Sequence, residues 1–83
     1  MRLAKFVKFR EEKFGGVLFE TRSEKVFTLS PTATAIVREI GAGGDEHAIM
    51  ARLKDQFEDR DGAIEREVRA FVADLRQRGL LEE

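Results

Sequence analysis

The side chains that could perform catalysis in this 83-residue sequence are a single histidine and sixteen carboxylates. His47 stands between Glu46 and Ala48, and no second histidine exists to share proton transfer with it. The chain has no cysteine, and with no serine beside a second histidine it offers no nucleophilic triad. We therefore expect His47 to be a solvated surface residue and the chain not to be an enzyme.

The acidic segment before residue 63 has part of the spacing of a calcium-binding loop. Asp59, Asp61 and Gly62 match the third, fifth and sixth positions of such a loop. Its first position would be Phe57 and its twelfth Val68, neither of which is a ligand. Without thiolates, zinc sites and iron–sulfur clusters built from cysteine are also excluded. We interpret the segment as a helix-capping turn and expect no metal and no cofactor.

The glycine-rich segment 41–44 precedes a helical pattern, as phosphate-binding loops do. However, a dinucleotide-binding fingerprint follows a strand, whereas a helical pattern precedes this segment, and the lysine of a P-loop is missing. We expect a plain turn between two helices.

The first thirty residues have the composition of strands. Apolar residues in 5–10, Val17–Phe19 and Val26–Leu29 are branched or aromatic, as β-strands favour. The polar segment Glu11–Gly16 ends in two glycines and predicts a turn, and Arg22–Glu24 is a short polar connection. Short runs with short connections predict a three-stranded antiparallel meander.

From Ser30 onward the apolar period lengthens to about 3.6 residues. Ser30-Pro31 predicts a capped helix start, Asp45 predicts a second, and a third helix is expected from about Ala63 to Arg78. The predicted apolar faces are Ala33, Ile36, Val37 and Ile40; Ile49, Met50, Leu53 and Phe57; and Ile64, Val68, Phe71, Val72 and Leu75. Residues 1–83 are thus expected to form a single α+β domain, a meander followed by three helices and winged-helix-like, with Leu80-Leu81 folding back onto the core.

Net charge and hydropathy limit the kinds of partner that the chain is expected to bind. The net charge is −1, no apolar run approaches the length of a membrane span, and the first residues lack the apolar stretch of a signal peptide. We expect a cytoplasmic protein with no membrane partner. The third helix carries arginines that a winged helix could use on DNA, but acidic residues interleave them, so no nucleic-acid partner is expected. These are Arg66, Arg69, Arg76 and Arg78, among Glu65, Glu67 and Asp74.

The run Val26–Leu29 would lie at one edge of the meander. Only Lys25, at its start, guards it, and it contains no proline. Such an edge is covered by the chain's own tail or by a dimer partner, or it docks an incoming strand. Composition leaves these possibilities open, so the chain is expected to be a monomer or a homodimer.

Several segments resemble the PqqD-like family, especially its mycofactocin-system relatives. The opening Val7–Phe19 resembles the start of these proteins, and Val26–Ala33 resembles their strand-into-helix segment, with Ser30 where asparagine is common. Residues Glu67–Leu75 and Arg78–Leu81 resemble their third helix and its Gly-Leu-Leu end. The likeness covers nearly the whole chain.

This resemblance implies a RiPP recognition element, a peptide chaperone in natural product biosynthesis. Family members bind the leader of a ribosomally made precursor peptide as an added strand, in a cleft against the third helix, and present it to a radical SAM maturase. The residues expected to contact the leader are Lys25, Val26, Phe27, Thr28 and Leu29 on the strand, and Glu67, Ala70, Phe71, Asp74 and Arg78 on the helix. The alternatives are a winged-helix nucleic-acid-binding regulator and a strand-swapped structural dimer.

Overall fold

The predicted strands form one antiparallel sheet in the computed structural model of the chain, which describes residues 1–58 and 61–82. Strands β2 (Val7–Glu12), β3 (Gly15–Glu20) and β4 (Lys25–Leu29) lie in the order β2-β3-β4. The three helices follow in the chain, which confirms the predicted α+β class.

The hairpin between β2 and β3 is tighter than its composition suggests. Glu11 and Glu12 belong to β2 and pair with Gly16 and Gly15 of β3, so the turn is reduced to Lys13 and Phe14. The predicted turn over Glu11–Gly16 is therefore too long. Polar residues and glycines at the end of an exposed hairpin can continue the ladder, because solvent reaches their side chains while the main chains pair.

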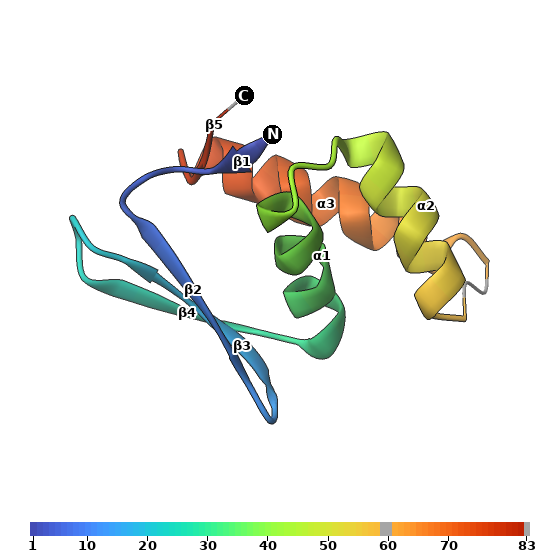
Figure 1. The fold of residues 1–83 in the computed structure, drawn as a ribbon, viewed down its shortest axis with the longest axis horizontal. Coiled ribbons are helices and arrows are strands. Elements are labelled where there is room, and N and C mark those ends of the chain that lie inside the picture. The colour runs from blue at the N-terminus through green and yellow to red at the C-terminus, as the bar shows by residue number, and fades with distance from the viewer. Residues whose placement is uncertain (59–60, 83) are drawn as a thin grey trace.

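The three helices lie on one side of the sheet, with α1 next to it and α2 farther away (Figure 1). They are α1 (Pro31–Gly41), α2 (Glu46–Gln56) and α3 (Ala63–Gln77). Both predicted caps are confirmed: the Ser30 side chain accepts from the Ala33 amide at 3.1 Å, and that of Asp45 accepts from the Ala48 amide at 2.8 Å. These caps set where α1 and α2 begin, and hence which side of each helix is turned toward the core.

A single core fills the space between the helices and the sheet. The predicted apolar faces supply most of it, and Leu18 and Leu29 contribute from the sheet. The least exposed large side chains are Leu18, Ile36, Ile40, Ile49, Leu53, Leu80, Val37, Val68 and Val72. Leu80 is only 1% exposed, so the predicted return of the C-terminal segment onto the core is confirmed.

A short ladder that the sequence did not predict joins the two ends of the chain. Strand β1 (Arg2–Leu3) pairs antiparallel with β5 (Leu81–Glu82), and the two ends lie side by side in Figure 1. The Ala4 amide donates to the Leu80 carbonyl at 2.8 Å. Two-residue strands are too short for a detectable apolar period. The ladder holds Leu80 in place beneath the end of α3.

The turn before α3 uses left-handed backbone. Asp61 and Gly62 have φ angles of 58° and 70°, and Gly62 occupies the N-cap position without a side-chain bond. The predicted turn is therefore present, although Asp59 lies outside the described residues.

Gly15 allows the start of β3 to approach the end of β4. Its φ is +149°, and a Cβ built there would lie 2.2 Å from the Leu29 carbonyl oxygen. The Gly15→Ala change is expected to destabilise the protein by at least about 2 kcal/mol, because strain and overlap add. Chemical denaturation would measure this. Gly41→Ala is the matched control, since nothing lies within 4 Å of its Cβ position; equal stability of the two variants would contradict the expectation.

Candidate functional site

Strand β4 has one edge that no strand in the described chain pairs with. Two hydrogen bonds show which main-chain groups of β3 face each neighbouring strand. The Thr21 amide donates to the Phe6 carbonyl on the β2 side, and the Glu24 amide donates to the Glu20 carbonyl on the β4 side. Main-chain groups alternate along a strand, so Gly16, Leu18 and Glu20 face β4, and their register partners Leu29, Phe27 and Lys25 face back. The N–H and C=O groups of Val26 and Thr28 therefore point away from β3, toward the unpaired edge of β4.

A cavity of about 220 Å³ lies between β4 and the C-terminal half of α3. Apolar side chains dominate it, with one acid and one base. Its lining residues are Leu18, Phe27, Thr28, Leu29, Phe71, Asp74, Leu75, Arg78 and Leu80. Phe27 and Phe71 are half-buried and pack against the core. The open main-chain edge of β4 and an apolar cavity thus adjoin each other.

Arg78 connects the two sides of this cavity. Its Nε lies 3.0 Å from Asp74 Oδ2 and 3.1 Å from Oδ1, and its guanidinium carbon lies 5.1 Å from the centre of the Phe27 ring. Both charged side chains are about half exposed. In the free protein the Arg78 cation therefore lies over the Phe27 ring while about half of its side chain stays exposed to solvent.

Six of the ten predicted contact residues line this cavity: Phe27, Thr28, Leu29, Phe71, Asp74 and Arg78. Thr28 lies opposite Val17 in the register, so its side chain is on the same sheet face as that of Val26. The other four do not line it. Lys25 is exposed at the start of β4, and Glu67 and Ala70 are exposed one turn earlier on α3. Val26 faces Phe19 in the register, and its side chain lies on the sheet face away from the helices, with Val17 and Lys8.

Three leucines in the cavity were absent from the predicted contact set: Leu18, Leu75 and Leu80. The sequence marked Leu75 and Leu80 as core residues, and Leu18 as part of a strand. A buried residue can also form the floor of a cavity, and apolar periodicity does not separate these two roles.

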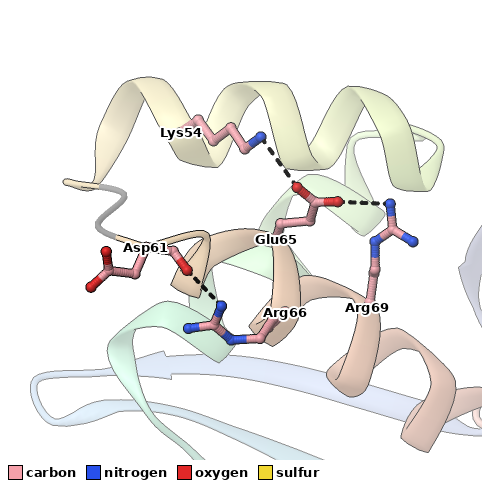
Figure 2. A network of polar contacts seen from close by, with 5 residues as sticks. All are labelled: Lys54, Asp61, Glu65, Arg66 and Arg69. Atoms are coloured by element: carbon pink, nitrogen blue, oxygen red, sulfur yellow. Dashed lines mark hydrogen bonds and ion pairs between the residues drawn. The ribbon is translucent and has the colours of Figure 1, made fainter.

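The arginines of α3 are engaged with neighbouring groups. Figure 2 shows Glu65 between Lys54 of α2, at 3.7 Å, and Arg69, at 2.8 Å. Arg66 donates to the Asp61 carbonyl at 2.5 Å. These contacts give α3 the mixed charge that its sequence predicts.

Potential metal ligands are not clustered in the described part of the chain. His47 is exposed, and residues 1–58 and 61–82 contain no cluster of three or more potential metal ligands. Among these same residues, no helix is both long and apolar enough to cross a membrane. The groove beside β4 is therefore the site whose geometry most directly suggests a function.

Comparison with known proteins gives one family and two similar structures. A family model described as coenzyme PQQ synthesis protein D matches residues 15–81. TbiB1, solved in complex with the TbiA(beta) leader peptide, has a TM-score of 0.86 and 21% identity, over 99% of this chain and 95% of that one. Lasso peptide synthetase B1, solved with the leader peptide, has a TM-score of 0.82 and 26% identity, over 99% and 96%. No curated protein matches the chain.

The contact between Arg78 and Phe27 is expected to stabilise the free protein. Arg78→Ala removes an exposed i,i+4 ion pair and a cation–π contact, for a total of about 1 kcal/mol. Arg69→Ala is the matched control, because it removes an i,i+4 pair on the same helix and should cost about 0.5 kcal/mol or less. Denaturation of both variants measures the difference, and an equal loss would show that the aromatic contact contributes nothing.

Proposed function

The chain belongs to the family of coenzyme PQQ synthesis protein D, and from this premise we propose that it binds the leader of a ribosomally made precursor peptide along β4 and presents it to a maturation enzyme. The observation that carries the proposal is the juxtaposition of an unpaired strand edge with an apolar cavity. The leader peptides bound to the two similar structures support it.

Main-chain pairing supplies part of the affinity. A leader strand antiparallel to β4 would meet the outward groups of Val26 and Thr28 and form about four hydrogen bonds, worth roughly 2–6 kcal/mol in total at 0.5–1.5 kcal/mol each. Micromolar binding requires about 8 kcal/mol net of association costs. Backbone pairing is therefore insufficient by itself, and side-chain anchors must supply the remainder.

The cavity has the size and chemistry for such anchors. At about 220 Å³ it is smaller than typical small-molecule sites of about 300–1,000 Å³, and it suits apolar side chains that project from alternate positions of an added strand. Asp74 and Arg78 at its rim, together with Lys25 and Glu67 nearby, would select charge in the leader. Specificity would then come from the side chains of α3, and affinity would come from both α3 and the edge of β4.

The chemistry of maturation would reside in the partner enzyme, and this chain would act as a binding protein. The resemblance to PqqD-like proteins of the mycofactocin type favours a radical SAM enzyme as that partner. A lone exposed His47 and the lack of cysteine fit a chain that contributes recognition and no bond-making group.

Proline substitutions on β4 test the docking edge. Thr28→Pro removes an outward donor while leaving the helices untouched, and it is expected to weaken binding of the cognate precursor by at least about tenfold. Val26→Pro removes the other outward donor and should act similarly. Thr28→Ala keeps the amide and should bind nearly as the parent does. Calorimetric titration measures the affinities, with thermal unfolding to verify that each variant is folded.

Folded proline variants that bind the precursor as tightly as the parent would contradict the proposal. If the parent instead forms a dimer that Thr28→Pro dissociates, and the precursor does not bind, β4 is a subunit contact and the alternative of a strand-swapped dimer is correct.

A further inference from the structure

The sheet face turned away from the helices carries a second apolar surface. No helix within residues 1–58 and 61–82 covers this face (Figure 1), and the side chains of Val17, Phe19 and Val26 lie on it. Val26 is 59% exposed. A shallow depression of about 610 Å³ runs over these residues, larger than the cavity beside α3. We call Val17, Phe19, Val26, Lys8 and Arg10 the outer patch.

The outer patch has a positive edge. In the register Lys8 lies opposite Phe19 and Arg10 lies opposite Val17. Arg10 is neutralised by Glu12, whose carboxylate lies 2.6 Å from its Nε, whereas Lys8 forms no ion pair with a described residue. An apolar surface with an uncompensated cation at its border fits a partner whose own apolar surface is bordered by carboxylates.

We infer that the outer patch docks the maturation enzyme, through an apolar surface of that enzyme edged by acidic residues. This inference rests on the proposed function for the identity of the partner. It uses a different face of the molecule, so the leader and the enzyme can be bound at once: the leader at the edge of β4, and the enzyme on the opposite side of the sheet from α3.

The size of the face argues against a second copy of this chain as the occupant. Three strands of five or six residues make a face of roughly 20 Å by 14 Å from standard strand dimensions. That is about a third of the ~800 Å² that each partner buries in a stable complex. Two copies meeting here would also bring Lys8 of each toward the other's positive edge, which is unfavourable.

A small interface is sufficient for an enzyme, because the precursor itself links the two proteins. With its leader on β4 and its remaining segment in the enzyme, the precursor raises the effective concentration of one protein near the other. The direct contact can then be weak and still place the adaptor correctly, and it can release the enzyme once the precursor has been modified.

Two substitutions on the outer patch test this assignment. Lys8→Glu reverses the uncompensated charge on an exposed strand position, and Phe19→Thr removes the aromatic surface while keeping strand propensity. Each is expected to weaken binding of the cognate maturation enzyme by about tenfold, measured by biolayer interferometry without precursor. Affinity for the precursor should stay at the parent's value. Lys13→Glu at the hairpin turn is the matched control, with the same charge change outside the patch.

The Lys8→Glu variant keeps the test valid if Phe19→Thr does not fold. Enzyme binding unchanged in Lys8→Glu would overturn the inference, as would sedimentation showing a parent dimer that Phe19→Thr dissociates. Failure of the parent to bind the precursor would contradict the proposed function instead, and the outer patch would still be judged by the enzyme titration.

Discussion

The constraint that organises this molecule is the unpaired edge of β4. Two main-chain donors and two acceptors, at Val26 and Thr28, face outward from a three-stranded sheet that does not close on itself. Edges of this kind are commonly blunted by charge, proline or a covering segment. Here only Lys25 offers charge along the strand, and α3 is set back by the width of a cavity. In the free protein, water must form hydrogen bonds with these main-chain groups, and an incoming strand can replace that water.

The remaining structure keeps this edge straight and accessible. Gly15 lets β3 approach the Leu29 carbonyl closely, and the Ser30 cap starts α1 immediately after β4, so the chain leaves the sheet without crossing its open side. The terminal ladder retains Leu80 under the groove. Val26 links both proposed binding surfaces: its main chain belongs to the edge, and its side chain belongs to the outer patch. The proposed leader site and the proposed enzyme site therefore lie on adjacent sides of one strand.

The sequence predicts the helices and the strands of the sheet, but it leaves the directions of the β4 side chains open. Apolar periodicity and the caps at Ser30 and Asp45 identify all three helices, and branched and aromatic runs identify the strands of the sheet. The direction of each β4 side chain depends on register, and a shift of one residue reverses every side chain. The register of β4 against β3 is set by the connection over residues 21–24, and the polar composition of Arg22–Glu24 does not fix it. The sequence therefore leaves open which β4 side chains point into the groove, and in the structure the Val26 side chain lies on the other face. The ladder of β1 and β5 involves too few residues to leave a pattern.

Hydrogen exchange of individual amides tests the central claim most directly. When the precursor peptide is added to the protein, we expect the Val26 and Thr28 amides to become strongly protected. The amides of Phe27 and Leu29 already face β3 and should change little. This alternation is specific to strand addition and would not arise from general stabilisation. Protection that appears on α2 or on the free edge of β2, with Val26 and Thr28 still exchanging as in the free protein, would contradict it.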